Sequence, residues 1–463
     1  MAWLGFEVYD ALNNTPWRDR MKAIFCTSTC SQTQNKPRFS RGVWLAGAIL
    51  LSTLMPNALP LTAPWSSAIL PVQAAETAEK TAQPQLSPEM RQTLDRYFEA
   101  LETHHKFMGG VALSQGGQVV YERYLGQARP DGSAIGPRTG MRIGSISKSF
   151  TAVMIMQLIE SGKLSLKTPL AEFFPQLPQA DNITVSDLLN HRSGLANFTN
   201  APEYTTYMTQ PQSQAAMLQR IASAALDFPP GSKAAYSNSN YYLLSLILEK
   251  SLGVSYAQAL EAKIVKPLGL QQTGYARSAD QQAGEARSFS RKADQWVLEP
   301  ETDMSIPLGA GAMVSTPRDL NHFFRALFQG KLLSNDALQE MTALQNGYGR
   351  GLFPYTFNEQ KGFGHNGGID GFISTSAYYP AWDLNLTVLS NGLALPLDDI
   401  SLALLQVYAG QPFAPPDFSQ QAQHLSETQA QPLLGTYASA QLALKIRIFW
   451  AADQLQAQAT GQG

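Results

Sequence analysis

Strand-like segments stand at both ends of the main part of this chain, and a long helical segment separates them. Two β-rich runs within Gly109–Gly126 are joined through Gly116-Gly117, which is the pattern of a tight hairpin. Strand-like runs return only at Gly371–Pro380 and Leu384–Gly392. Between them, Ser145 to about Leu270 has mostly helical periodicity interrupted by glycine and proline. Segments this far apart must pair to make one antiparallel sheet.

Helical patterns lie on either side of this set of strands. "MRQTLDRYFEALETHH" (Met90–His105) precedes the hairpin, and "LDDISLALLQVYAG" (Leu397–Gly410) follows the last strand. We therefore predict an α/β fold of the α+β type, with an antiparallel sheet flanked by helices and an inserted helical block. Within that block, we interpret the apolar stripe from Met154 to Ile159 as core packing.

The first part of the chain has the layout of an export signal. Lys36, Arg38 and Arg41 precede an apolar run, Gly42–Met55, and no charged residue follows until Glu76. The apolar run is shorter than the ~20 residues that span a bilayer. We predict that residues 1–75 direct export and that the mature protein is periplasmic or secreted.

Two alternatives remain for this segment. Cleavage is expected after "VQA" (Val72–Ala74), but an uncleaved segment would anchor the chain in a membrane, and Met21 is an alternative start. Cys26 and Cys30 both precede the apolar run, so the mature protein would have no disulfide and no cysteine metal site.

Composition and charge narrow the classes of partner. The chain is 44% hydrophobic, which favours a globular protein, and its formal net charge is -2. Without a dense Lys/Arg run it has no patch that would neutralise phosphates, so we expect no nucleic-acid partner. No two histidines have metal-ligand spacing on one face, so we expect no metal and no cofactor.

The chain divides into five predicted parts. The export region (1–75) is followed by a polar linker (76–88) and a catalytic domain (89–410). A Pro- and Gln-rich linker (411–424) then leads to a small, partial β-barrel-like unit (425–463). We expect that last unit to contribute little to catalysis, because the chemistry-bearing residues all precede Gly410.

The first of these chemical motifs is "SISK", in which Ser145 and Lys148 are three residues apart where a loop becomes an apolar helix. Positions i and i+3 share a helix face, so the Lys148 amine would lie beside the Ser145 hydroxyl. A desolvated lysine titrates lower than usual and can take the hydroxyl proton. The alternative interpretation is that Ser145 caps the helix and Lys148 is solvated.

Two further motifs favour the catalytic interpretation. Tyr236-Ser237-Asn238 stands on a loop before an apolar helix, and His365-Asn366-Gly367-Gly368 stands at the predicted start of a strand. In this order, the three motifs resemble the serine β-lactamase and penicillin-binding-protein superfamily, and the tyrosine form resembles its class C β-lactamase and D-alanyl-D-alanine carboxypeptidase branch. The stretches "ITVSDLLNHRSGL", "KPLGLQQTGYA" and "GAGAMVSTPRDL" also resemble this branch.

The resemblance implies a role for each residue that matches a motif. Ser145 would be acylated, and Lys148 and Tyr236 would share the proton transfers, with either of them as the general base. Asn238 would bind the amide side of the substrate, and the backbone N–H groups of Ser145 and Gly368 would form the oxyanion hole.

The third motif would supply further contacts with the substrate. Asn366 is implied to bind substrate, and Gly367 and Gly368 let the backbone approach it closely. His365 replaces the lysine of many superfamily members. An unperturbed histidine titrates near 6.5, so we expect His365 to carry a partial positive charge at neutral pH and to hold a substrate carboxylate.

The leading hypothesis is therefore an exported serine hydrolase that acts on D-amino-acid peptides or related amides and esters. The expected partner is a small-molecule or peptide substrate, with peptidoglycan-derived peptides as one source. A true β-lactamase is a second hypothesis, although His365 counts against it. The third is a penicillin-binding or sensor protein that stays acylated.

Overall fold

The computed structural model describes residues 86–276, 284–292, 294–418, 425–438, 445–451 and 454–459. These residues fall into two compact units, one within Pro84–His424 and one that includes Leu425–Gly463. The predicted export segment, both cysteines and most of the predicted linker 76–88 lie outside the described residues.

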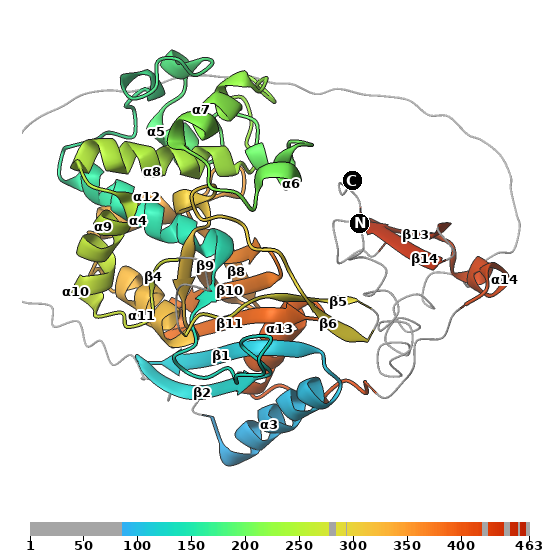
Figure 1. The fold of residues 1–463 in the computed structure, drawn as a ribbon. Coiled ribbons are helices and arrows are strands. Elements are labelled where there is room, and N and C mark those ends of the chain that lie inside the picture. The colour runs from blue at the N-terminus through green and yellow to red at the C-terminus, as the bar shows by residue number, and fades with distance from the viewer. Residues whose placement is uncertain are drawn as a thin grey trace, which may run out of the picture. The chain divides into compact units, whose positions relative to one another are not determined.

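One large sheet forms the centre of the unit within Pro84–His424 (Figure 1). Its strands follow the order β2-β1-β11-β10-β9-β8, and a β5–β6 hairpin joins it beside β11. The strands are β1 (Phe107–Gln115), β2 (Gln118–Leu125), β5 (Phe289–Lys292), β6 (Gln295–Leu298), β8 (Phe353–Phe357), β9 (Gln360–Ile369), β10 (Phe372–Tyr379) and β11 (Leu384–Leu393). β1 pairs antiparallel with β11, with Val111 opposite Val388. The predicted closure of the sheet by sequence-distant segments is confirmed.

The hairpin of β1 and β2 turns through Gly116 and Gly117, as predicted. Their φ angles are 59° and 83°, a left-handed conformation that residues with a side chain rarely adopt. Two such residues in a row are what a two-residue hairpin turn requires. The glycine pair therefore fixes both the position of this turn and the register of the strands beside it.

Two parts of the strand arrangement were not predicted. β5 pairs with β11 in parallel, with Phe289 opposite Gly392. A separate three-stranded sheet contains β3 (Met141–Arg142), β7 (Met313–Ser315) and β4 (Gly274–Tyr275). The strands involved have only two to four residues, too few to show an alternating pattern in the sequence.

Helices cover both faces of the large sheet (Figure 1). α3 (Pro88–Thr103) and α13 (Leu397–Tyr408) pack on one face in a shared core. α11 (Pro317–Phe328) packs on the other face, where Phe323 stacks on Phe150 of α4 (Ser147–Glu160) with ring centroids 3.6 Å apart. The remaining helices of this unit are α5 (Val185–Leu189), α6 (Tyr204–Tyr207), α7 (Gln214–Ser223), α8 (Asn238–Leu252), α9 (Tyr256–Leu260), α10 (Lys266–Leu268) and α12 (Asn335–Thr342).

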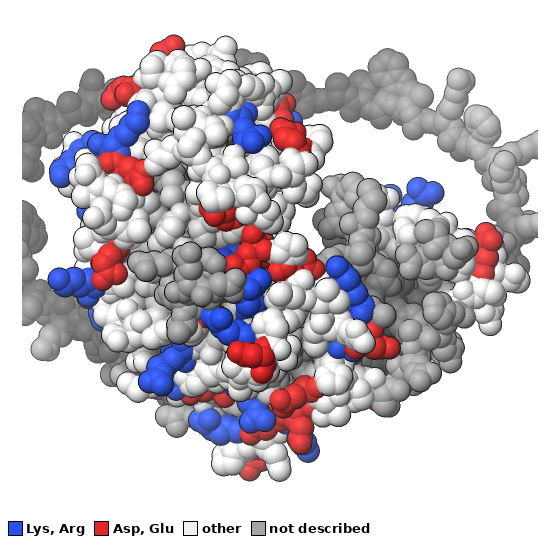
Figure 2. Space-filling model, in the orientation of Figure 1, with Lys and Arg blue, Asp and Glu red and all other residues white. Residues whose placement is uncertain are grey.

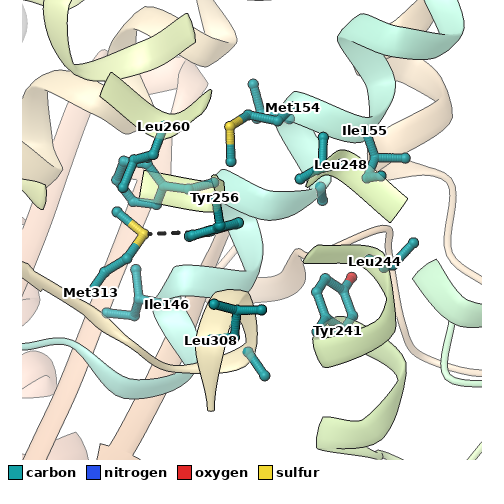
Figure 3. Packing of buried hydrophobic residues seen from close by; sticks show 14 of the residues in the cluster. Ile146, Met154, Ile155, Tyr241, Leu244, Leu248, Tyr256, Leu260, Leu308 and Met313 are labelled. Atoms are coloured by element: carbon teal, nitrogen blue, oxygen red, sulfur yellow. Dashed lines mark hydrogen bonds between the residues drawn. The ribbon is translucent and has the colours of Figure 1, made fainter. Parts of the chain in front are cut away.

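α4 is buried on almost every side. Figure 3 shows Met154 and Ile155 of this helix among Leu244 and Leu248 of α8 and Tyr256 of α9. Met154, Met156 and Leu158 are at most 2% exposed, and Ile159 is partly buried against the same core, which confirms the predicted core packing of this stripe. A close-packed interior resists small displacements, so this packing fixes where the N-terminus of α4 lies.

The second unit contains a small antiparallel sheet with the strand order β12-β13-β14. Its strands are β12 (Gly435–Ala438), β13 (Lys445–Ala451) and β14 (Gln454–Ala459), and the short helix α14 (Glu427–Ala430) precedes them. Short strands were expected in this part of the chain.

The charge pattern of the described surface and the apolar length of the described helices bear on polyanion and membrane partners. Figure 2 shows acidic and basic side chains intermixed over the face in view, without a field of one sign. Of the described helices, none combines the length with the apolar character that crossing a bilayer takes.

Part of the predicted linker packs against the rest of the unit within Pro84–His424. The ring of Phe413 meets Tyr97 of α3 edge to face, with centroids 5.3 Å apart. The ring of Phe418 lies 5.8 Å from that of His104, and Lys106 Nζ lies 5.5 Å from its centre. Both phenylalanines are half-buried. Residues 411–418 thus add apolar contacts to the face that α3 covers.

Truncation measures what this segment contributes. A chain that ends after Gly410 should still fold, but it should unfold at a lower urea concentration than a chain that ends after Phe418. The shorter chain loses two half-buried rings, and burial of this kind stabilises by about 1–3 kcal/mol. Equilibrium urea unfolding of both chains gives the difference. Equal midpoints would mean that residues 411–418 act only as a linker.

Candidate active site

Ser145 lies in a single 3₁₀ turn, Gly144–Ile146, between β3 and α4. Gly144 has a left-handed φ of 49°, and a Cβ atom there would lie 2.7 Å from the backbone nitrogen of Gly368. The Ser147 hydroxyl donates to the carbonyl of Gly144 at 2.7 Å and closes the turn. Only glycine fits at position 144, and it brings the loop of Ser145 against β9.

Two side chains contact the Ser145 hydroxyl. Lys148 Nζ lies 2.9 Å from Ser145 Oγ, as the i, i+3 spacing predicted. The Tyr236 hydroxyl, from the loop before α8, donates to the same oxygen at 2.7 Å. The structure thus brings together the first and second sequence motifs around one oxygen atom.

Lys148 is fully buried, with 0% of its surface exposed. Its Nζ donates to the Ala310 carbonyl at 2.7 Å and to Asn238 Oδ1 at 2.8 Å. Burial lowers the pKa of Lys148 well below its ordinary value. A neutral amine has two protons, and the two carbonyl-type oxygens would take both of them. The lone pair would then point at the third neighbour, Ser145 Oγ, where it can accept a proton.

Tyr236 is a neutral phenol in this environment. Burial raises its pKa, and its hydrogen bond to Ser145 opposes that shift without cancelling it. Its ring lies 4.4 Å from that of His191, whose Nδ1 accepts a hydrogen bond from the backbone of Ser237 at 3.1 Å. His191 therefore supports the Tyr236 loop. Tyr236 can give a proton to an oxygen or nitrogen beside Ser145, but it is a poor base in the free protein.

Asn238, the first residue of α8, has a fixed amide orientation. While Oδ1 accepts from Lys148, Nδ2 donates to Thr199 Oγ1 at 3.2 Å. The backbone N–H of Asn238 donates to Asn197 Oδ1 at 3.1 Å. Thr199 and Asn197 were not predicted, and neither was the Ala310 carbonyl. No local pattern marks these residues, since each reaches the site from a distant part of the chain.

The third motif lies in the C-terminal half of β9, five residues after the strand begins at Gln360. The prediction that it starts the strand was wrong, because the glycines on either side of Phe363 hid the first half of the strand. A Cβ on Gly367 would lie 2.1 Å from the Ile143 carbonyl and 2.9 Å from the nitrogen of Ser145. The backbone of β9 therefore touches that of the Ser145 loop. Gly368 is exposed beside it, so its N–H can face a ligand.

Among the described residues, no hydrogen bond joins His365 or Asn366 to Ser145. The Asn366 side chain is exposed, and His365 is only 1% exposed. His365 Nδ1 donates to the Asn366 carbonyl at 2.5 Å, and its ring packs 4.3 Å from that of Phe353. Since the carbonyl can only accept, Nδ1 carries the proton and Nε2 is left as an acceptor.

The expectation that His365 is partly charged at neutral pH was wrong. Burial is the main cause that lowers the pKa of His365, to about 3. The sequence could not reveal this shift, because it depends on how deeply β9 is buried. A neutral His365 cannot form an ion pair with a substrate carboxylate.

Aromatic rings that were not predicted also border the site. Phe353 of β8 lies 6.4 Å from Tyr236 and 5.6 Å from Tyr348, measured between ring centroids. Phe353 and Tyr348 are both half-buried. Together they place an apolar surface beside the ring of Tyr236.

The chain is similar to a known protein family and to individual members of known function. The beta-lactamase family model matches residues 94–411, which is most of the chain. The D-alanyl-D-alanine-carboxypeptidase/endopeptidase AmpH of Escherichia coli K12 is 30% identical over 282 residues, covering 58% of this chain and 68% of AmpH.

Solved structures give the same fold. A D-stereospecific amidohydrolase from Streptomyces matches with a TM-score of 0.59 and 26% identity, over 70% of this chain and 98% of the other. The D-amino acid amidase of Ochrobactrum anthropi SV3, in complex with L-phenylalanine amide, also matches with a TM-score of 0.59 and 26% identity, over 69% and 97% of the two chains.

The Lys148 environment predicts a specific response to substitution. Lys148→Arg should lower kcat/KM by about 10²–10⁴-fold, because a guanidinium keeps its proton and cannot act as a base. In the unmodified protein, the rate should reach its plateau far below pH 10, because the pKa of Lys148 is lowered. Rate profiles between pH 5 and 10 test both points. A rate that climbs only near pH 10, or an active Lys148→Arg variant, would exclude Lys148 as the base.

Proposed function

The chain belongs to the beta-lactamase family of serine hydrolases, and on that premise we propose that it is an exported enzyme that hydrolyses D-amino-acid amides, esters and peptides through an acyl-enzyme on Ser145. One observation carries the proposal. A single hydroxyl oxygen, Ser145 Oγ, lies 2.9 Å from a fully buried lysine amine and 2.7 Å from a neutral tyrosine hydroxyl. That arrangement pairs a nucleophile with one proton acceptor and one proton donor.

In the proposed reaction, Ser145 Oγ bonds to the substrate carbonyl carbon as its proton passes to Lys148. The N–H groups of Ser145 and Gly368 stabilise the negative oxygen that forms. The bond to the leaving amine or alcohol then breaks, and the leaving group takes a proton from Tyr236, which Lys148 restores. Water hydrolyses the resulting ester by the same steps, which frees the acid and Ser145.

Substrates without a free carboxylate next to the scissile bond are favoured. The buried, neutral His365 supports this choice, because the family's third motif then brings no positive charge to the substrate. The similarity to a D-amino acid amidase and a D-stereospecific amidohydrolase also supports an amide substrate. The similarity to AmpH favours a second candidate activity, D-alanyl-D-alanine carboxypeptidase.

A matched pair of substrates separates the two activities. N-acetyl-D-alanyl-D-alanine and its C-terminal amide share the D-alanyl-D-alanine bond and differ in terminal charge, and product masses separate cleavage of that bond from loss of ammonia at the terminal amide. We expect faster hydrolysis of the amide, with a ratio of the two kcat/KM values that stays constant between pH 5.5 and 8, since His365 does not titrate in that range. A ratio that changes with pH, or a faster free acid, would favour the carboxypeptidase.

The same assay needs a control for the nucleophile. Ser145→Ala should hydrolyse neither substrate and should show no covalent mass increase with a fluorophosphonate. Rapid cephalosporin hydrolysis by the unmodified enzyme would favour a β-lactamase instead. Stable acylation by a β-lactam, without hydrolysis of either peptide, would favour a penicillin-binding or sensor protein.

Export is proposed on the sequence of residues 1–75, which lie outside the described residues. We expect the mature natural protein to begin near Ala75 and to be recovered outside the cytoplasm. N-terminal sequencing of the protein from fractionated cells tests this. A chain that starts at Met1 or Met21 in the soluble cytosolic fraction would contradict it, and an intact chain in the membrane fraction would indicate an anchor.

A further inference from the structure

A buried ion pair lies directly behind the candidate active site. Arg142 stands three residues before Ser145, and Asp370 stands two residues after Gly368. Arg142 Nη1 lies 3.1 Å from Asp370 Oδ2, and the two side chains are 2% and 0% exposed. The pair thus joins the segment that carries Ser145 to the turn that follows the Gly367-Gly368 backbone.

A third segment completes the connection. The backbone N–H and the hydroxyl of Thr302 donate to Asp370 Oδ1 at 3.0 and 2.6 Å. Arg142 donates in turn to the Thr302 carbonyl at 3.1 Å and to Glu301 Oε2 at 3.2 Å. Asp370 therefore accepts three hydrogen bonds with its side chain shielded from water, and these contacts oppose, without cancelling, the rise in its pKa that burial causes.

Strand pairing does not hold these segments together. β3, with Arg142, pairs with β7, whereas β9 pairs with β8 and β10. The Ser374 hydroxyl adds a short link, since it donates to the Ile143 carbonyl at 2.9 Å. Backbone contact at Gly144 and Gly367 limits how closely the Ser145 loop and β9 approach, and side-chain contacts must then keep the two segments from moving apart.

The conformation at Asp370 makes that distance sensitive to the ion pair. Asp370 has a left-handed φ of 54°, in the turn between β9 and β10. Aspartate is one of the few residues with a side chain that adopt this conformation, and here the hydrogen bonds from Arg142 and Thr302 hold its carboxylate in place. Loss of the pair would let the turn relax, and Gly368 would move with it.

We propose that the Arg142–Asp370 pair is a positioning element for the proposed oxyanion hole, holding the Gly368 N–H at the correct distance from the Ser145 N–H. This inference rests on the proposed function, because it assumes that those two N–H groups stabilise the transition state. Neither Arg142 nor Asp370 touches the substrate. Their effect on the reaction passes through the backbone of the β9–β10 turn.

The same sheet offers a control pair of the same chemistry that is less buried, with side chains 22% and 25% exposed. Asp383 follows β10 as Asp370 precedes it, also has a left-handed φ, of 44°, and also pairs with an arginine. Arg325 Nε and Nη2 lie 2.8 and 2.7 Å from its two carboxylate oxygens. This pair is at the other end of β10, away from Ser145. Asp383→Asn therefore shows how the loss of an ion pair affects folding when the pair lies away from Ser145.

The experiment compares Asp370→Asn with Asp383→Asn in the full chain. Asp370→Asn should lower kcat by about 10–100-fold with KM changed less than about twofold, because it misplaces an oxyanion donor. Asp383→Asn should leave both constants within about twofold of the unmodified enzyme, whatever it does to the urea midpoint. Equal effects of the two substitutions on kcat would overturn the proposal.

A second measurement does not depend on the substrate. The rate of Ser145 labelling by a fluorophosphonate should also fall by about 10–100-fold in Asp370→Asn and stay unchanged in Asp383→Asn, since the phosphonyl oxygen needs the same N–H donors. If the unmodified protein is labelled but hydrolyses no D-amino-acid amide, the proposed substrate fails and the labelling rates still decide this inference. Unchanged labelling of folded Asp370→Asn would overturn it.

These measurements require that the Asp370→Asn variant folds. If Asp370→Asn does not fold, Thr302→Val replaces it, since that change removes one hydrogen bond to Asp370 and keeps the ion pair. We expect its labelling rate to fall by about 3–10-fold, in line with a loss of about 1 kcal/mol of positioning. Circular dichroism and urea unfolding establish that it is folded. Labelling at the unmodified rate by folded Thr302→Val would also overturn the inference.

Discussion

Burial of the Lys148 amine against three oxygen atoms is the interaction on which the rest of the site depends. Ser145 Oγ, Asn238 Oδ1 and the Ala310 carbonyl come from three separate segments, and all three lie within 2.9 Å of Nζ. A charge buried this deeply is costly, so the same packing that removes water also favours the neutral amine. Ser145 and Asn238 belong to the helical block between the strands of the sheet. The block therefore has a chemical role as well as a structural one, because it supplies residues that surround Lys148 Nζ.

Close approach of backbone to backbone is the second constraint. Gly144 and Gly367 lie where a Cβ atom would collide with the backbone of the facing segment. Side chains at these two positions would force the Ser145 loop away from β9. Glycine is thus required by geometry on both sides of one contact, while the Arg142–Asp370 pair stabilises that contact from behind.

The features that the sequence predicted correctly are those that local patterns of residues encode. The glycine pair of the first hairpin, the apolar stripe of α4 and the i, i+3 relation of Ser145 and Lys148 each follow from residues within a few positions of one another. The Thr199 contact with Asn238 joins segments 39 residues apart, and the Arg142 contact with Asp370 joins segments 228 residues apart. The periodicity of apolar residues in the sequence does not indicate which distant residues will pair. The charge of His365 was missed for a related reason, since a residue's burial is a property of the whole fold and not of its neighbours in the chain.

The pairing of β1 with β11 also constrains how the molecule is made. These strands come from opposite ends of the catalytic unit, so the ladder between them has a high contact order. Forming it requires the closure of a long loop, and the entropic cost of that closure falls late in folding. During synthesis, the β1–β2 hairpin presents an unpaired edge until almost the entire unit has left the ribosome. A nascent chain in that condition is a natural client for chaperones, and any product that stops before β11 leaves the same edge open to aggregation.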